Sequence, residues 1–534
     1  MKNIIITISI FVFSVAITLN LSAQSADKSD WAGGYPEGCT SITVGKNASF
    51  DGSVITSHTD DSHRTRSWID IIPARHHSKG EKVIMYKRVK NDSLAMPAYG
   101  HKEVGSIPQV SYTNGYINTA YPSLNDKQLG IGESTFGGRE ELQSDAGIID
   151  CQRLCLLMLE RESTARGAIK VAGELLKEYG WNDYGEVLTI ADKNEVWHLE
   201  IVGPGKGKVG AVWVAQRVPD GHISVNANAS TIKQINLKDE DHFLASDNVY
   251  DVAKENGWWN PKEEFYFCYA YAPHSRTSPA SRRREWRVFN LLAPSLGLDP
   301  NDKDYPFSVK PDTLVTLENL MNVFKDYYEG TPFDMTKNLT VTDKEGKTVI
   351  SPLASPHMPY DANNLHKING GWGPLGERTI ARWYTMYATI IQLRNWLPDE
   401  IGGVEWLAMD NVATSIYVPI YGCVSDLPEP YKTPGRINGY TLNSAWWIFN
   451  RLGTLTSQRW GEMRHDVDAV WKPMQLKLIE NQKNVDNQAL DLYKENKKDA
   501  IEFLNYYSNE QGEKVMKEAI KLGDFLWTKY DEKF

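Results

Sequence analysis

The chain has 534 residues, of which 41% are hydrophobic, and this is enough to build a large buried core. Its formal net charge of −10 at pH 7 argues against nucleic acid or an anionic membrane surface as a partner. Five cysteines are an odd number, so at least one thiol is left over from any set of intramolecular disulfides.

Residues 1–23 have the pattern of a secretion signal. Lys2 supplies a short basic region, residues 4–21 are almost wholly apolar, and Ala23 offers a small residue for cleavage before Gln24. An uncleaved anchor is the alternative, since roughly 18 apolar residues could just span a bilayer. Cleavage is favoured because a polar stretch follows at once. The mature protein is therefore expected to be exported, periplasmic or secreted, and free of the membrane.

Residues 24–38 are polar and rich in glycine, and we interpret them as a short propeptide or lead. Residues 40–44 then alternate between the two faces of a strand, and residues 46–52 supply a turn that ends in Asp-Gly. Residues 53–58 return as a second strand. Cys39 is thus predicted at the open start of a hairpin whose second strand brings His58, Thr59, Asp60 and Asp61 back beside it.

The middle of the chain alternates between helical and strand patterns. Residues 129–138 are predicted as a strand that runs into a glycine-rich loop, without the Gly-x-Ser-x-Gly spacing of a serine hydrolase. Residues 148–179 carry two helical patterns. Four strands are then predicted as an antiparallel meander with one buried face, at residues 187–191, 196–202, 209–218 and 222–226.

The remaining elements are mostly helical. Helices are predicted from Ser281 to Leu292, over 312–327 and over 443–526, whereas residues 384–394 suit either a helix or a strand. Residues 415–421 are predicted as a strand at a sheet edge or bulge, because Pro419 cannot donate a ladder hydrogen bond.

Cys39 has three interpretations. It can be a buried structural cysteine, half of a disulfide with Cys268 or Cys423, or a nucleophile. If cleavage after Gly38 freed its α-amine, with a pKa near 8 in peptides, that amine could take the thiol proton directly. Glycine before the nucleophile suits a strained self-cleavage geometry.

The other cysteines carry no comparable signal. Cys151 and Cys155 stand four residues apart on one face of a predicted helix and are expected to be small core residues. The spacing of cysteines and histidines resembles no zinc motif, and no His-Glu-x-x-His occurs. Neither a metal nor a cofactor is therefore expected.

Residues 39–53 read Cys-Thr-Ser-Ile-Thr-Val-Gly-Lys-Asn-Ala-Ser-Phe-Asp-Gly-Ser. This run resembles the start of the mature dipeptidases of peptidase family C69, which are N-terminal-nucleophile (Ntn) hydrolases. Further blocks resemble the family's central and later strands, at residues 191–200, 213–220, 225–232 and 417–422. The resemblance extends over residues 39–450.

The resemblance implies an α+β fold, a four-layer αββα Ntn sandwich of two antiparallel sheets between helical layers. It also implies hydrolysis of dipeptides by the thiol of Cys39 with its own α-amine as base. By motif, Asp61 would hold that amine and Asn228 would donate to the oxyanion. Arg284 is the best match for an arginine near the substrate, with Arg282 as the alternative.

One departure falls beside the nucleophile. The family pattern is Arg-Asn-Glu-Asp where this chain has His58-Thr-Asp-Asp61. His58 is therefore grouped with Arg284 as a substrate-binding residue, and the binding of a substrate carboxylate is expected to differ.

The chain is accordingly divided into a signal peptide (1–23), a lead (24–38), a catalytic domain (39–450) and a helical C-terminal region packed on it (451–534). The expected function is that of an exported cysteine dipeptidase with small peptides as substrates, and homo-oligomerisation is left open. The alternatives are another Ntn amidase, acting on bile salts, penicillin V or acylated amines, and an inactive binding protein of the same fold.

Overall fold

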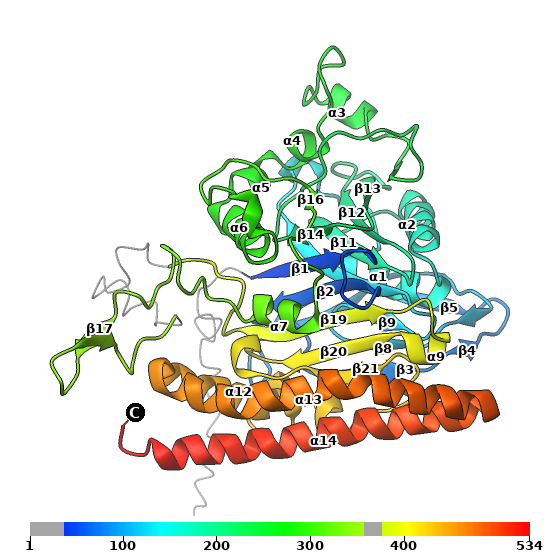
Figure 1. The fold of residues 1–534 in the computed structure, drawn as a ribbon. Coiled ribbons are helices and arrows are strands. Elements are labelled where there is room, and N and C mark those ends of the chain that lie inside the picture. The colour runs from blue at the N-terminus through cyan, green and yellow to red at the C-terminus, as the bar shows by residue number, and fades with distance from the viewer. Residues whose placement is uncertain (1–36, 357–375, 534) are drawn as a thin grey trace, which may run out of the picture.

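The computed structural model describes residues 37–356 and 376–533, and it contains two large antiparallel sheets with helices packed against them (Figure 1). The predicted signal peptide and most of the predicted lead lie outside the described residues. No helix in these two ranges combines the length and the apolar character needed to cross a bilayer.

The first sheet has seven strands. Their order is β16 (Ser308–Val309), β14 (Ile223–Asn226), β1 (Gly38–Val44), β2 (Val54–Asp61), β19 (Thr385–Leu393), β20 (Val404–Met409) and β21 (Val418–Tyr421). The predicted hairpin is confirmed, because β1 and β2 pair with Cys39 opposite Asp60. The ambiguous segment at 384–394 is strand β19. Pro419 lies in β21 at the edge of the sheet, as predicted.

The second sheet has eight strands. Their order is β15 (Phe243–Ala245), β13 (Val212–Val218), β12 (Val196–Val202), β11 (Gly185–Ala191), β10 (Gly130–Phe136), β9 (Leu124–Asn125), β8 (Tyr116–Asn118) and β3 (Asp70–Ile72). Three of the four predicted meander strands are here as β11, β12 and β13.

The fourth predicted strand, β14, belongs to the other sheet, so the prediction of a four-stranded meander was wrong. After the turn that follows β13, β14 pairs with β1, and β15 takes the place beside β13. The prediction of a single buried face was also wrong, since every residue of β11 and β12 is buried. Helices cover the face that would otherwise meet water.

The two sheets pack face to face, with β10 in contact with β1 and β2. Two glycines of β10 permit an unusually close approach. A β-carbon on Gly132 would lie 2.5 Å from the carbonyl oxygen of Ser57 in β2, and one on Gly130 would lie 2.8 Å from Cγ2 of Ile391. The backbone of β10 can therefore come close to β2, and Glu133 follows directly on Gly132.

Helices contact both sheets from outside, which makes the fold α+β. α1 (Cys151–Arg161) and α2 (Ala165–Tyr179) pack against the eight-stranded sheet, where α1 contacts β9 and α2 contacts β11 and β12. α6 (Pro279–Leu292) contacts β14 of the seven-stranded sheet and also α7 (Leu317–Phe324). Ser278 caps α6 by accepting a hydrogen bond from Ser281 N, and Pro279 follows at the first helical position.

The C-terminal region is helical, as predicted, and it consists of three helices. α12 (Ala445–Gln458), α13 (Trp460–Glu495) and α14 (Lys497–Lys529) run along the β20–β21 side of the molecule (Figure 1). Asp486 of α13 forms a buried ion pair with Arg394 and accepts a hydrogen bond from Tyr421 at 2.7 Å. The helices share one apolar core with the sheets, and residue 450, the predicted domain boundary, falls within α12.

The remaining described α-helices have only four or five residues, and the remaining strands form three two-stranded sheets, of which β5 with β6 is the longest at 10 and 11 residues. They comprise the helices α3 (Asp251–Glu255), α4 (Phe267–Tyr271), α5 (Pro273–Thr277), α9 (Asp399–Gly402), α10 (Glu429–Lys432) and α11 (Gly435–Asn438), and the strand pairs β4 (Arg75–His76) with β7 (Tyr112–Thr113), β5 (Lys82–Asn91) with β6 (Ala98–Pro108) and β17 (Thr340–Thr342) with β18 (Thr348–Ile350).

Candidate active site

Cys39 is the second residue of β1, and the alternation of strand side chains decides which groups share its face. Cys39 pairs with Asp60, so their side chains point the same way, into the space between the two sheets, and His58 follows them because it lies two residues from Asp60. Thr40 and Asp61 point to the opposite face. The hairpin therefore brings Asp60 and Asp61 close to Cys39 from two different sides.

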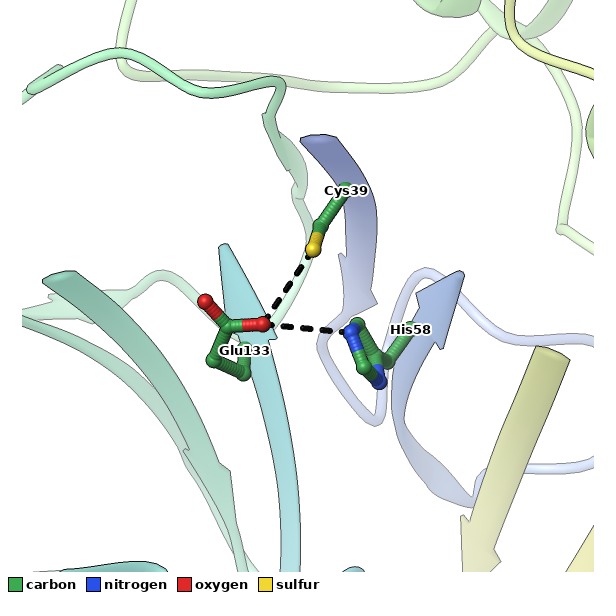
Figure 2. A group of neighbouring side chains, drawn as sticks. All are labelled: Cys39, His58 and Glu133. Carbon is green, nitrogen blue, oxygen red and sulfur yellow. Dashed lines mark hydrogen bonds and ion pairs between the residues drawn. The ribbon is translucent and has the colours of Figure 1, made fainter. Parts of the chain in front are cut away.

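Glu133 of β10 reaches across the sheet interface to the thiol (Figure 2). Sγ of Cys39 donates to Oε2 of Glu133 at 3.2 Å, and Nε2 of His58 lies 3.3 Å from the same oxygen. Ser41 Oγ also donates to the backbone carbonyl of Glu133 at 2.8 Å, which fixes β10 against β1. One carboxylate oxygen thus contacts both the thiol and the imidazole.

A second buried carboxyl group sets the charge of Glu133. Burial and the neighbouring Glu133 raise the pKa of Glu186 well above its usual range, so Glu186 is protonated. Burial alone would also raise the pKa of Glu133, but its contacts with His58 and Glu186 lower that pKa to about 2. The pair therefore holds one proton and one negative charge, and the charge lies on the residue that faces Cys39.

Thr135 joins the two carboxyl groups. Its hydroxyl oxygen lies 3.0 Å from Oε1 of Glu133 and 2.9 Å from Oε1 of Glu186. A hydroxyl has a single hydrogen to donate, so one of these contacts has to be donated by the other partner. Protonated Glu186 can donate to Thr135 while Thr135 donates to ionised Glu133, in agreement with the pKa directions.

The backbone of Cys39 is held by Asn228 and Arg284. Oδ1 of Asn228 accepts the Cys39 N–H at 3.0 Å, and Nδ2 donates to the carbonyl of Thr135 at 2.6 Å. Arg284 Nη1 donates to the Cys39 carbonyl at 2.6 Å, and Nη2 donates to Asn228 Oδ1 at 2.8 Å. Asn228 has a φ of 61°, a left-handed conformation that asparagine tolerates better than most residues.

Arg284 is wholly buried, and most of its hydrogen bonds go to backbone oxygens. Besides the Cys39 carbonyl it reaches the carbonyls of Ala227 at 3.0 Å and Ala280 at 3.1 Å. Burial and the charge of Arg378 lower its pKa to about 9. Arg284 lines the cavity described below, but its donors are engaged in positioning the nucleophile strand.

Asp61 lies on the other face of β2, where its carboxylate is held chiefly by Arg378 and Thr385, with a longer contact of 3.5 Å from Thr59 Oγ1. Arg378 Nη2 contacts Asp61 Oδ2 at 2.5 Å, and Thr385 Oγ1 donates to Oδ1 at 2.6 Å. Gly38 pairs with Asp61 across the hairpin. A β-carbon on Gly38 would lie 2.5 Å from Asn228 Oδ1 and 3.1 Å from Arg378 Nη2, so the residue before Cys39 has no room for a side chain.

A cavity of about 1370 Å³ opens at the Gly38–Cys39 bond, ample for a dipeptide. Its described lining includes Cys39, Asp60, Asp61, Asn228 and Arg284. Burial, with the negative charges of Glu133, Asp60 and Asp61, raises the pKa of the Cys39 thiol well above its usual range. Within the intact chain this thiol is therefore neutral.

The five residues predicted for the site are brought together, but at different depths. Cys39, Asp61, Asn228 and Arg284 line the cavity, whereas His58 is 2% exposed and lies beneath Cys39 against Glu133. Contact of His58 or Arg284 with substrate stays a prediction. Arg282 donates to the Asp302 carbonyl at 2.6 Å on the exposed side of α6 and is not among the lining residues.

Sequence reasoning missed Glu133, Glu186 and Arg378. A signal for Glu133 was present, because a carboxylate stands within a strand pattern directly after Gly-x-Gly, where two sheets can approach closely. All five cysteines are free thiols, so the disulfides considered for Cys39 are not formed. Cys39, His58 and Glu133 also offer three ligand atoms within 4.8 Å of one another, although no metal was expected.

Comparison with known proteins agrees with this geometry. The model of the peptidase family C69 matches residues 38–473. A probable dipeptidase of Latilactobacillus sakei is 27% identical over 489 residues, covering 88% of this chain and 91% of the relative. Dipeptidase A of Lactobacillus helveticus is 25% identical over 439 residues, covering 80% and 84%, respectively. Since the family match spans most of the sequence, this chain belongs to peptidase family C69 and is a cysteine peptidase.

Proposed function

We propose that this chain is an exported dipeptidase of the N-terminal-nucleophile type, and that its two sheets with their helices form the four-layer αββα sandwich of that class. Relatives that carry the name dipeptidase support the substrate class. The apolar segment that precedes a polar stretch at residue 24 supports export. The family match begins at Gly38, which supports Cys39 as the first residue of the active enzyme.

The observation that carries the mechanism is the arrangement around the Gly38–Cys39 bond. Hydrolysis of this bond leaves a carboxylate on Gly38 and an α-amine on Cys39. The amine would remain beside Asn228 Oδ1, which accepts the Cys39 N–H at 3.0 Å in the intact chain. A free amine next to the buried thiol is a stronger base than the Glu133 carboxylate that contacts the thiol in the intact chain, and an adjacent ammonium stabilises the thiolate.

Dipeptide hydrolysis then follows in two steps. The Cys39 thiolate attacks the scissile carbonyl, a C–S bond forms, and the C–N bond breaks as the α-ammonium gives its proton to the departing amine. The α-amine next takes a proton from water, whose oxygen attacks the thioester and releases the first amino acid and the thiol. The amine thus acts as acid in one step and as base in the other.

Asn228 has two duties in this scheme that compete for its amide. Oδ1 suits the α-amine, whereas Nδ2 is the donor predicted for the oxyanion and is already 2.6 Å from the Thr135 carbonyl. An oxyanion therefore has to draw Nδ2 away from Thr135 or share it. Asp61, with Arg378 fixed at 2.5 Å, supplies a negative charge near the ammonium.

Intact mass and N-terminal sequencing of the exported protein test this proposal, together with a substrate panel. We expect the active form to begin at Cys39 and to release free amino acids from dipeptides, and Cys39→Ala to be inactive on them. Faster turnover of acylated amines, bile salts or penicillin V would identify another Ntn amidase instead. Full dipeptidase activity in protein that retains residues 24–38 would contradict the mechanism, and recovery of active protein only from the cytoplasm would contradict export.

A further inference from the structure

Cys39, His58 and Glu133 surround one point between the two sheets with a sulfur, an imidazole nitrogen and a carboxylate oxygen (Figure 2). The three ligand atoms lie within 4.8 Å of one another. We propose that this triplet binds a divalent cation of the zinc class, and that an ion held there reversibly blocks the Cys39 thiol.

The distances already approach those of a tetrahedral site. Zinc binds sulfur at about 2.3 Å, imidazole nitrogen at about 2.0 Å and carboxylate oxygen at about 2.0 Å, so the edges between neighbouring ligands are about 3.3–3.5 Å. Sγ of Cys39 lies 3.2 Å and Nε2 of His58 lies 3.3 Å from Oε2 of Glu133. Two of the three edges therefore fit without a movement of the backbone.

The donor set favours zinc over magnesium or calcium. A thiolate and an imidazole are ligands for zinc-like ions, whereas magnesium and calcium prefer sites built from oxygen. An ion with two positive charges would also balance the thiolate and the carboxylate, which otherwise repel each other. Three protein ligands leave a fourth position for water, and Cys39 borders the cavity through which an ion can enter.

His58 gives the independent indication of a ligand. Its side chain is 2% exposed, and Nε2 makes no hydrogen bond of ordinary geometry with any described residue, although it lies 3.3 Å from Glu133. A buried nitrogen without such a bond is costly unless something else engages it. A metal ion between Nε2, Sγ and Oε2 would engage it.

The surrounding groups hold the ligands in place. The imidazole stands edge-on between the rings of Tyr121 and Tyr387, with centroids 5.5 and 5.6 Å away. The carboxylate oxygen of Glu133 that does not face the thiol receives the Thr135 hydroxyl at 3.0 Å. Such outer contacts orient ligands before an ion arrives and strengthen binding.

The residue at position 58 decides whether the site exists. The family pattern that the chain resembles has arginine there, and a guanidinium is always charged and offers no lone pair to a metal. Metal binding should therefore be a property of this chain that arginine at position 58 removes.

Calorimetric titration with zinc, after treatment with a chelator and desalting, tests the site in the mature protein. We expect one ion per chain, and cobalt in place of zinc should give the absorption of a thiolate-to-cobalt charge transfer. His58→Arg should weaken zinc binding by about 100-fold or more, since even a residue behind a ligand contributes 10–100-fold. His58→Gln serves as a second variant if His58→Arg does not fold.

The matched control is Cys151→Ser. Glu133 also belongs to a neighbouring triplet with Cys151 and Glu186, whose ligand atoms lie within 4.8 Å of one another. Cys151→Ser removes the sulfur of that triplet and should leave zinc binding unchanged. Loss of binding in Cys151→Ser with retention in the His58 variants would overturn the proposal, and so would absence of zinc binding to the wild-type protein.

The binding site stands on geometry, whereas the block of activity rests on the proposed function. Stoichiometric zinc should abolish dipeptide hydrolysis, a chelator should restore it, and zinc should protect Cys39 from alkylation by iodoacetamide. Zinc binding in a protein that hydrolyses no dipeptide would refute the proposed function and leave the site intact. Dipeptidase activity that zinc does not inhibit, in a protein that binds no zinc, would refute the site alone.

Discussion

Two buried glutamates show how differently one interior treats the same side chain. Glu133 of β10 and Glu405 of β20 are both 0% exposed. Burial raises the pKa of Glu405 to about 7, and only the Ser123 hydroxyl, 2.5 Å away, opposes this. The pKa of Glu133 instead falls to about 2, because His58 and protonated Glu186 outweigh burial.

The difference teaches that partners, and not depth, decide the charge of a buried carboxyl group. At the Cys39 end an imidazole, a hydroxyl and a second carboxyl group surround Glu133, so a charge is kept beside the thiol. Glu405 has one hydroxyl, that of Ser123, as its hydrogen-bond partner, and its carboxyl group is neutral through much of the acidic pH range. Ionised glutamate marks the reactive end of the sheet interface.

The largest effect is expected from Cys39→Ala. Removal of the attacking sulfur should lower kcat/KM on dipeptides by about 10⁴-fold or more. Cys39→Ser keeps the shape of the side chain and should also be severely impaired, since a hydroxyl is a far weaker nucleophile than a thiolate. Steady-state assays on purified protein measure both, with unfolding curves as a check on folding. Alanine at position 39 with activity near wild type would remove Cys39 from the mechanism.

Glu133→Gln tests whether the negative charge of Glu133 beside the thiol is needed for activity. The amide keeps the size of the side chain but removes the negative charge that receives the Cys39 Sγ–H. We expect kcat/KM to fall by about 10²-fold, because the thiol loses the acceptor that orients it and misplacement of a reacting atom by about 1 Å can cost that much. A bell-shaped pH profile whose acidic limb shifts or disappears would separate this role from a purely structural one.

Glu405→Gln is the control for that prediction. It makes the same chemical change in an equally buried residue whose partner, Ser123, lies outside the cavity lining. Its kcat/KM should stay within about twofold of wild type, as for a change that touches no reacting group. An equal loss in both variants would mean that each substitution lowers activity by disturbing the fold. The two glutamates would then not differ in their role in catalysis.

Gly38→Ala should slow removal of the lead. An alanine β-carbon would lie 2.5 Å from Asn228 Oδ1, so Asn228 or Gly38 has to shift, and the hydrogen bond to Cys39 N shifts with it. We expect precursor to accumulate several-fold, and intact mass spectrometry of newly exported protein measures it. Gly221→Ala, where a β-carbon also meets nothing within 4 Å and which lies outside the cavity lining, is the matched control. Equal processing of both variants would show that space at Gly38 is unimportant.

Contacts between residues close in the sequence could be predicted, whereas contacts between distant residues could not. The hairpin and the position of Asp60 and Asp61 beside Cys39 follow from turn chemistry and strand alternation, both local properties. Glu133 comes from the other sheet, 94 residues away in the chain, and only packing decides that it meets Cys39. For the same reason β14 was placed in the wrong sheet, because periodicity predicts a strand but not its neighbour.

The smallest effect on function is expected from Glu405, whose ionisation changes the stability of the fold with pH. An ordinary glutamate has a pKa of about 4.3, so the unfolded chain releases the Glu405 proton before the folded chain does, which happens near pH 7. Between these values the folded state binds more protons, and stability falls as pH rises. This single residue accounts for about 4 kcal/mol as an upper bound.

Glu405→Gln cannot ionise and should therefore escape this loss. At pH 5 its melting temperature should lie close to or slightly below that of wild type, since both side chains are neutral in the folded state there. At pH 8 the variant should be the more stable protein, and its melting temperature should vary less between the two pH values. Thermal unfolding monitored by circular dichroism at fixed ionic strength measures this. Parallel curves for the two proteins would mean that Glu405 is already ionised in the fold, and the contrast with Glu133 would then rest on position alone.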